Sequence, residues 1–126
     1  MQFYEKRLHQ AETLTQTSNY QYLEVTGLKA KIPTVVGATY MLFYEAYWYS
    51  TYNSGNVEIY FFPRIENQGG YTGSAVGGLP QNHCSGMVYF TAIGANTTIQ
   101  FFSGGRVPTT LEFQPQYCRW YVFRVK

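Results

Sequence analysis

Residues 38–50, Ala-Thr-Tyr-Met-Leu-Phe-Tyr-Glu-Ala-Tyr-Trp-Tyr-Ser, restrict the fold more than any other part of the sequence. Their aromatic side chains favour a β-strand, in which successive side chains point to opposite faces. One face then carries Tyr40, Leu42, Tyr44, Ala46 and Trp48, and the other carries Met41, Phe43, Glu45, Tyr47 and Tyr49. An antiparallel sandwich buries one face of each strand and leaves the other to water. Because both faces here are large and aromatic, we expect another copy of the chain to cover the second face.

The composition also favours a subunit that works in an assembly. Charged residues make up 13% of the 126 residues, against about 25% in ordinary globular proteins. Aromatic residues reach 19%, and tyrosine leads with 13 copies. A tyrosine ring covers apolar surface while its hydroxyl tolerates water, which suits interfaces. The alternative is a monomeric sandwich that uses a tyrosine-rich surface to bind a ligand.

Charge and hydropathy argue against several classes of partner. The net charge of +2 is too small to indicate nucleic acid, and basic residues are not interleaved with the aromatic ones as in single-strand binders. No apolar run is long enough for a membrane-spanning helix. The first ten residues lack the apolar core of a signal peptide, so we expect synthesis in a host cytoplasm.

Turn-forming residues recur at short intervals along the whole chain, and no segment has the pattern of a long helix. This predicts an all-β, antiparallel sandwich or barrel of about eight to ten strands. The charged residues 1–12 predict a loose arm or a short helix ahead of a single sandwich domain over 13–126. We expect strands over 11–17, 20–26, 28–32, 38–50, 57–62, 85–93, 97–102 and 117–126, a hairpin turn at 53–55, a further turn at 103–106, and a loop over 67–82 with at most one short edge strand.

The chain contains no Asp, and all seven acidic residues are Glu. An Asp-rich calcium loop and a Ser-His-Asp triad are therefore excluded. Glu45 lies among aromatic residues and needs a cationic partner, for which Arg119 and Arg124 are the candidates. We interpret Glu45 as a structural ion pair or an interface specificity device, and we expect neither enzymatic activity nor a cofactor. A hydrolase that uses Glu45 as a catalytic acid is the alternative.

His83 and Cys84 are the adjacent pair that could suggest a metal site. Zinc sites usually need four ligands, and His9 and Cys118 are the other His and Cys of the chain. We therefore expect no metal. Cys84 and Cys118 are interpreted as buried free thiols, and a bridge between them stays open if strands place them side by side.

Three segments carry a resemblance to a known group of proteins. They are Gly37-Ala-Thr-Tyr-Met-Leu-Phe-Tyr44, the run 85–94 followed by 97–102 around a Gly/Asn turn, and the terminal Trp120-Tyr-Val-Phe123. Together they resemble the compact jelly rolls of the tumour-necrosis-factor (TNF) and complement-globular-head type. The step Val25-Thr-Gly-Leu28 is also similar to the opening of many bacteriophage and viral appendage proteins. The resemblance implies a TNF-like jelly-roll sandwich that forms a homotrimer on a virion.

This resemblance implies a non-enzymatic virion structural protein, a trimeric capsid decoration or appendage subunit whose partner is the major capsid or tail protein. The oligomer interface is then predicted to contain Tyr40, Phe43, Glu45, Tyr47, Tyr49, Tyr121 and Phe123. Attachment to the partner is predicted through Phe3, Tyr4, Arg7 and Leu8, on the N-terminal arm. The alternative function is a receptor-binding tip of a tail or fibre, where Tyr71, Gln81 and Asn82 contact a host glycan.

Overall fold

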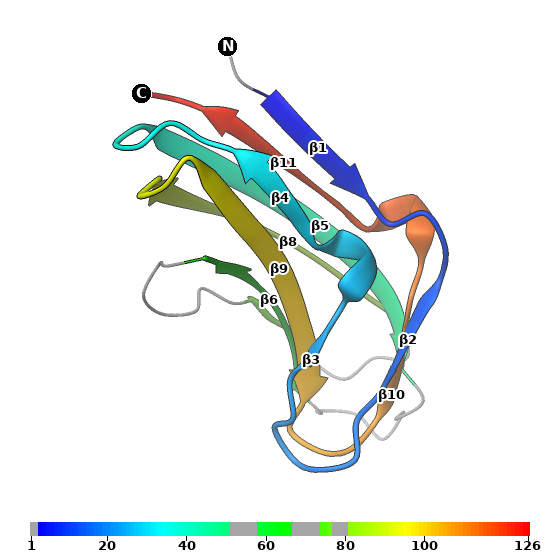
Figure 1. Cartoon of the computed structure of the whole chain (residues 1–126). Coiled ribbons are helices and arrows are strands. Elements are labelled where there is room, and N and C mark those ends of the chain that lie inside the picture. The colour runs from blue at the N-terminus through cyan, green and yellow to red at the C-terminus, as the bar shows by residue number, and fades with distance from the viewer. Residues whose placement is uncertain (1–2, 51–57, 67–73, 77–80) are drawn as a thin grey trace.

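The structure, a computed structural model, describes residues 3–50, 58–66, 74–76 and 81–126, with the backbone alone for 74–76, 81 and 82 (Figure 1). Within these ranges the chain forms strands and two short 3-10 helices. In order they are β1 (Phe3–Arg7), β2 (Glu12–Thr15), β3 (Leu23–Glu24), η1 (Thr26–Leu28), β4 (Ala30–Pro33), β5 (Thr39–Ser50), β6 (Ile59–Ile65), β7 (Ser74–Val76), β8 (Gln81–Thr91), β9 (Asn96–Gly105), β10 (Thr110–Phe113), η2 (Pro115–Tyr117) and β11 (Arg119–Arg124).

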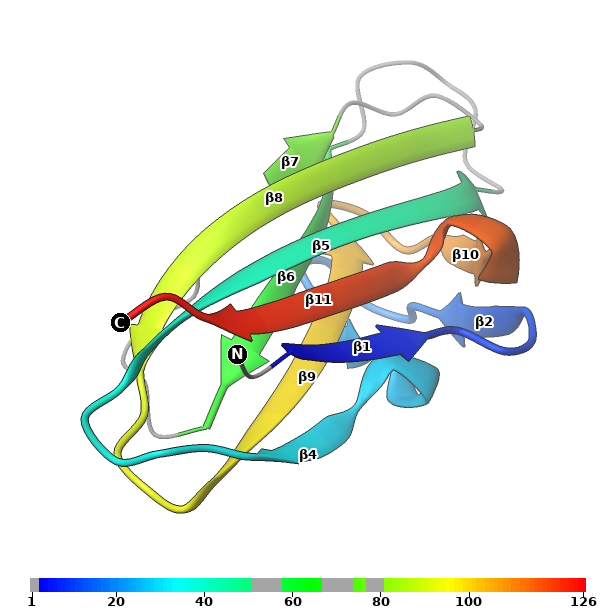
Figure 2. The ribbon, with the colours of Figure 1, turned by 90° about the horizontal axis from the view of Figure 1, so that it is seen from above.

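The strands form two antiparallel sheets. Sheet A has the order β1-β11-β5-β10-β2, with β8 also paired to β5, and sheet B has the order β3-β9-β6-β7, with β4 also paired to β9. Figure 2 looks onto sheet A, where β8, β5, β11 and β1 lie side by side and β6 and β9 lie behind them. The predicted all-β, antiparallel jelly-roll sandwich is confirmed.

The predicted alternation of β5 is also confirmed, because one of its faces forms the centre of the core. Tyr40, Leu42, Tyr44, Ala46 and Trp48 are all buried. Across the sandwich, the ring of Phe61 stacks on that of Phe101, with centroids 5.2 Å apart, and lies 6.1 Å from the ring of Trp48. Burial of these rings contributes to the hydrophobic driving force that holds the two sheets together.

Trp120 connects β11 of sheet A to η1, which lies between β3 and β4 of sheet B. Its side chain is fully buried, and its indole N–H donates to the backbone oxygen of Leu28, at 2.7 Å. The Val25–Leu28 step therefore forms η1 against the tryptophan rather than a strand. The carboxylate of Glu12 holds the start of η1, because it accepts the backbone N–H groups of Thr26 (2.6 Å) and Gly27 (2.8 Å).

The N-terminal segment differs from the prediction of an arm. Residues 3–7 form β1, which pairs with β11 in register from Phe3 opposite Phe123 to Arg7 opposite Arg119. The charged residues obscured the alternation of inward and outward side chains in this segment. Glu5 and Arg7 point outward, while Tyr4 packs against the core. Pairing also covers the edge of β11 that would otherwise offer unpaired backbone groups.

Other strand boundaries were missed where turn residues lie inside strands. β6 continues through Pro63 to Ile65. A proline is tolerated there because β7 pairs only with Ile59–Phe61, so Pro63 has a neighbouring strand, β9, on one side alone. β9 likewise continues through Gly104 and Gly105, where a turn was predicted. β10 was not predicted, and the segment expected to be a strand over 20–26 contains the two-residue β3. The predicted hairpin turn at 53–55 lies outside the described residues, and β7 is the short edge strand expected within 67–82.

Candidate functional site

The outer face of sheet A carries large apolar side chains that line up across four strands. Strand register places them in two rows. The first contains Phe3, Phe123, Met41 and Tyr89, and the second contains Tyr121, Phe43 and Met87, with the charged Glu5 at its end. Phe3, Met87 and Tyr89 are each more than half exposed. The ring of Tyr121 lies 5.8 Å from that of Phe3 and 6.4 Å from that of Phe43. A contiguous exposed apolar surface of this kind marks an interaction site.

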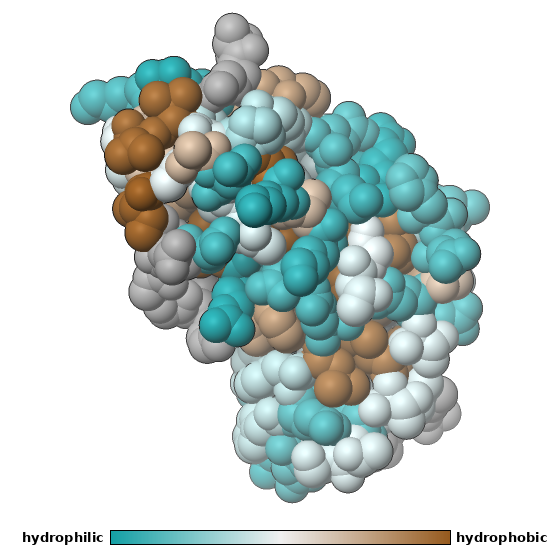
Figure 3. Space-filling model, in the orientation of Figure 1, coloured by the Kyte–Doolittle hydropathy of each residue, from teal (hydrophilic) through white to brown (hydrophobic). Residues whose placement is uncertain are grey.

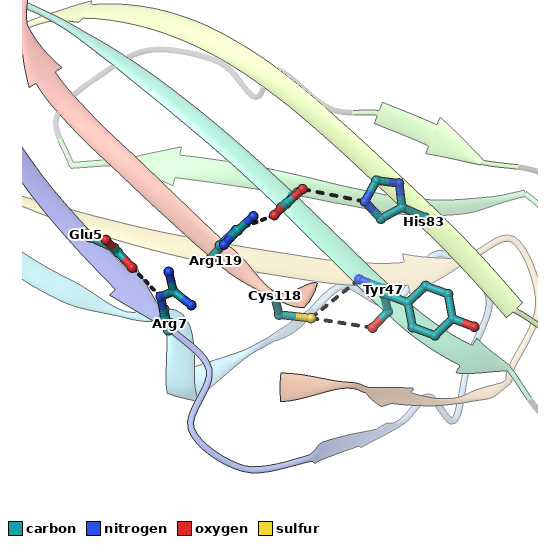
Figure 4. Close-up of polar contacts among 7 residues, drawn as sticks. Glu5, Arg7, Tyr47, His83, Cys118 and Arg119 are labelled. Carbon is teal, nitrogen blue, oxygen red and sulfur yellow. Dashed lines mark hydrogen bonds and ion pairs between the residues drawn. The ribbon is translucent and has the colours of Figure 1, made fainter. Parts of the chain in front are cut away.

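A charged group lies beside these apolar rows, where Arg119 is opposite Glu45 in register. The Nε of Arg119 donates to one carboxylate oxygen of Glu45, and the Nε2 of His83 lies 3.7 Å from the other (Figure 4). The side chain of Glu45 is 18% exposed and that of Arg119 is 34% exposed. The guanidinium also lies 5.6 Å from the ring centroid of Tyr121, a cation–π contact. The predicted ion pair of Glu45 is confirmed, and of the two candidate partners, Arg119 and Arg124, the structure shows Arg119.

Three tyrosines form a cluster beyond this charged group. The ring of Tyr47 makes edge-on contacts with Tyr49 and Tyr117, each at 5.5 Å. Partial desolvation, a hydrogen bond to Tyr49 and the neighbouring Tyr117 raise the pKa of Tyr47. The outer face thus offers rings and hydroxyl groups together, the combination found at the centre of many protein interfaces.

The structure brings most of the predicted interface residues together. Phe43, Glu45, Tyr47, Tyr49, Tyr121 and Phe123 all lie on the outer face of sheet A. Tyr40 does not, and its inclusion was wrong. Its ring is fully buried in the core, and its hydroxyl accepts the N–H of Val35, at 3.0 Å. Its place in the alternation of β5, opposite in phase to Phe43, could have shown this.

The predicted attachment residues are divided by the pairing of β1. Phe3 and Arg7 lie on the outer face of sheet A, and Arg7 forms an ion pair with Glu5 (Figure 4). Tyr4 packs against the core and Leu8 is buried within it. Tyr4 and Leu8 therefore cannot serve as free contacts for a partner. Phe3 and Arg7 instead extend the same surface that Phe43 and Tyr121 belong to.

The predicted glycan residues receive no geometry from the structure. Tyr71 lies outside the described residues. Gln81 and Asn82 begin β8, where their backbone pairs with Tyr49 and Trp48, and their side chains are not described. The prediction that these residues contact a glycan stays untested.

Cys84 and Cys118 are both buried free thiols. Cys84 pairs with Ala46 on one side of β5, while the thiol of Cys118, on the other side, contacts the backbone N and O of Tyr47, each at 3.4 Å (Figure 4). With a strand between them, their Cα atoms are about 9–10 Å apart, beyond the reach of a disulfide. The open question of a bridge is therefore resolved in favour of free thiols.

We predict that neither thiol reacts while the protein is folded. Burial raises the pKa of Cys84 to about 12 and that of Cys118 to about 11. At pH 8, at most about one thiol in a thousand is then the reactive thiolate. Alkylation by iodoacetamide, followed by mass spectrometry, should be slow in buffer and fast in denaturant. Rapid modification of the native protein would contradict this placement of the cysteines.

Among the described residues, no three His, Cys or Glu side chains lie close enough together to hold a metal ion. None of the helices in that same part of the chain has the length and apolar character needed to cross a membrane.

An exposed apolar tip was missed by the sequence analysis. The loops β4–β5 and β8–β9 are joined by hydrogen bonds from Thr34 N–H to the Ala95 oxygen (2.9 Å) and from Gly37 N–H to the Ala92 oxygen (2.8 Å). They expose Val35, Val36 and Ile93. Figure 3 shows hydrophobic atoms gathered over this end of the molecule. The apolar pair Val35-Val36 ahead of Gly37, in a turn, is the signal that could have revealed it.

Comparison with solved structures gives the fold independent support. The structure of the TNF protein Eiger from S. frugiperda aligns with 98% of this chain and 93% of its own, with a TM-score of 0.53 and 7% sequence identity. The carbohydrate-binding module TmCBM61, solved in complex with β-1,4-galactotriose, aligns with 98% of this chain and 88% of its own, with a TM-score of 0.43 and 9% identity. No protein-family model and no curated protein match the sequence. The chain therefore has a TNF-like jelly-roll fold, and its function must be inferred from its own surfaces.

Proposed function

We propose that the chain is a non-enzymatic structural subunit of a virion and assembles as a homotrimer through the outer face of sheet A. The observation that carries this proposal is the exposure of Phe3, Phe43, Met87 and Tyr89 on one continuous face of a single chain. Covering these side chains with a second copy removes apolar area from water, at about 25 cal/mol per Å². Three copies rather than two are proposed from the resemblance to trimeric jelly rolls.

The oligomeric mass in solution tests the proposal. Light scattering on the purified chain at micromolar concentration should give three times the mass of the 14.5 kDa chain. A stable monomer would contradict the assembly. The virion location is tested separately, because the chain should sediment with particles when lysates of the cells that produce it are fractionated. Absence from every particle fraction would contradict the virion proposal and leave the assembly in place.

The charged group on this face predicts a split between folding and assembly. Glu45→Gln removes an ion pair that is partly exposed in the single chain, so the free energy of unfolding should change by less than about 1 kcal/mol. In the trimer the same change leaves Arg119 covered and unpaired, which should weaken assembly by about 2–5 kcal/mol, or about 30-fold or more. Sedimentation equilibrium measures the second effect and urea unfolding the first.

His83→Gln is the matched control for this prediction, because its ring is half exposed and lies 3.7 Å from the carboxylate. We expect it to affect assembly at neutral pH far less than Glu45→Gln does. Equal effects of the two variants would show that the ion pair with Arg119 has no special part in the interface. A broad activity screen of Glu45→Gln against the unmodified chain also tests the hydrolase alternative.

A receptor-binding tip is the second candidate function. The observation in its favour is a group of exposed tyrosines on sheet B, away from the proposed assembly face. This group is distinct from the predicted residues Tyr71, Gln81 and Asn82.

A further inference from the structure

The outer face of sheet B carries an aromatic cluster that the assembly proposal does not use. Phe62 of β6 and Phe102 of β9 are opposite each other in register, and their rings stack with centroids 6.1 Å apart. Tyr22, just before β3, stands on this base. Its ring lies 5.2 Å from that of Phe62 and 6.1 Å from that of Tyr60, nearly perpendicular to both.

The cluster has a buried base and an exposed top. Phe62 is buried, whereas Tyr22 is 41% exposed and Tyr20 is 51% exposed. Gly104 lies opposite Tyr60 in register and lets the segment before β3 approach the sheet, since a Cβ there would come within 2.1 Å of the Gln21 backbone oxygen. The ring of Tyr22 is therefore held by packing against Phe62 and Tyr60. We call Tyr20, Tyr22 and Tyr60 the tyrosine platform.

Polar groups lie beside these rings. The hydroxyl of Tyr60 donates to the carboxylate of Glu58. This hydrogen bond, partial desolvation and the nearby carboxylate, Tyr20 and Tyr22 raise the pKa of Tyr60 to about 12. A phenol hydroxyl paired with a carboxylate thus lies among the three tyrosines at one end of sheet B.

Tyr20 itself occupies an unfavourable backbone conformation. Its φ is +55°, and it is the non-glycine residue with left-handed backbone in the described part of the chain. Bulky residues are rare in this conformation, and glycine adopts it with less steric strain. The N–H of Tyr20 donates to the Gly105 oxygen at 3.0 Å, which pins the residue in place. An exposed ring retained at a strained position indicates that the ring itself has a use.

We propose that the tyrosine platform binds a neutral carbohydrate. The C–H face of a pyranose ring packs on an aromatic ring, while its hydroxyls bond to phenol and carboxylate oxygens, and the platform offers both in one place. Glu58 repels an anionic sugar such as a sialic acid, so the ligand is an uncharged oligosaccharide. The platform lies on the opposite side of the sandwich from the outer face of sheet A. It therefore stays accessible when copies assemble, and the proposal does not depend on the trimer.

The test uses a printed array of neutral and sialylated oligosaccharides, followed by calorimetric titration with the soluble neutral oligosaccharide that binds best. We expect binding to neutral members and none to those with a sialylated end. Tyr22→Ala should weaken the titrated affinity by at least about tenfold. Tyr89→Ala, which removes an exposed tyrosine from sheet A, should leave that affinity unchanged. Each platform binds one soluble oligosaccharide independently, so a change in oligomeric state does not alter the measured affinity.

Tyr20→Gly separates a binding role from a structural one. The change removes the ring and relieves the left-handed strain, so the Tm should stay the same or rise while the sugar affinity falls. A lower Tm with unchanged affinity would overturn the proposal, because the ring would then serve packing alone. An array with no neutral ligand would also overturn it, as would an affinity that Tyr22→Ala leaves intact. If the platform captures a protein receptor but binds no sugar, the proposal is also overturned.

Discussion

Replacement of Trp120 by alanine should lower the free energy of unfolding by about 3–5 kcal/mol, the usual cost of deleting a fully buried aromatic side chain. The loss also leaves the Leu28 backbone oxygen without the indole N–H that it accepts at 2.7 Å. A domain of this size is stable by about 5–15 kcal/mol in total, so the variant should lose a large share of its stability and unfold at a much lower urea concentration. Urea unfolding followed by circular dichroism measures the change.

Trp120→Phe serves as the control, because it keeps most of the ring volume and removes the hydrogen bond. It should cost about 1–3 kcal/mol, the penalty of a buried acceptor that loses its donor. A Trp120→Ala variant that loses no more than Trp120→Phe would show that the ring contributes little to the packing between β11 and η1. The order of the two variants thus separates packing from hydrogen bonding.

The second large effect is expected from Phe43→Arg on the outer face of sheet A. Phe43 lies between Tyr121 and Met87 in register, at the centre of the apolar rows. A guanidinium there would be covered by the partner in place of an apolar ring, and assembly should weaken by about a thousandfold or more. Light scattering should then report a monomer at a concentration where the unmodified chain is a trimer.

Tyr22→Arg is the matched control for this change, because it also replaces an exposed aromatic residue with arginine but lies beside sheet B. It should remain a trimer. Circular dichroism should show that Phe43→Arg is folded, since Phe43 is exposed in the single chain. Dissociation by both variants would indicate that added charge, not the place of Phe43, is responsible. If the Phe43→Arg variant is still a trimer, the interface does not lie on this face.

The sequence predicted the parts of the fold that depend on alternation within one strand. The two faces of β5 were assigned correctly, from Leu42 inward to Phe43 outward, because burial of every second side chain leaves a pattern of period two. An ion pair of Glu45 with Arg119 or Arg124 was also predicted, since a carboxylate among aromatic residues needs a cation. The turn residues indicated an all-β fold but misplaced strand ends, as at Pro63.

The sequence could not show which side chains from distant strands meet. β1 was predicted as an arm because its residues are highly charged. The side chains of Glu5 and Arg7 lie on the outer face of a sheet that β1 joins only when it pairs with β11. The tyrosine platform was missed for the same reason. Tyr22 and Tyr60 are far apart in the chain, and their rings come together across Gly104, where a missing side chain makes room for the approach.

By itself, then, the sequence determined an antiparallel sandwich with a long strand, β5, that carries large aromatic side chains on both faces. Those properties follow from periodicity and composition, which act locally along the chain. The tertiary structure alone decided that β1 completes sheet A and that two separate aromatic surfaces lie on opposite sides of the molecule. These depend on strand order and register, which are set by the packing of the whole chain and leave no local pattern.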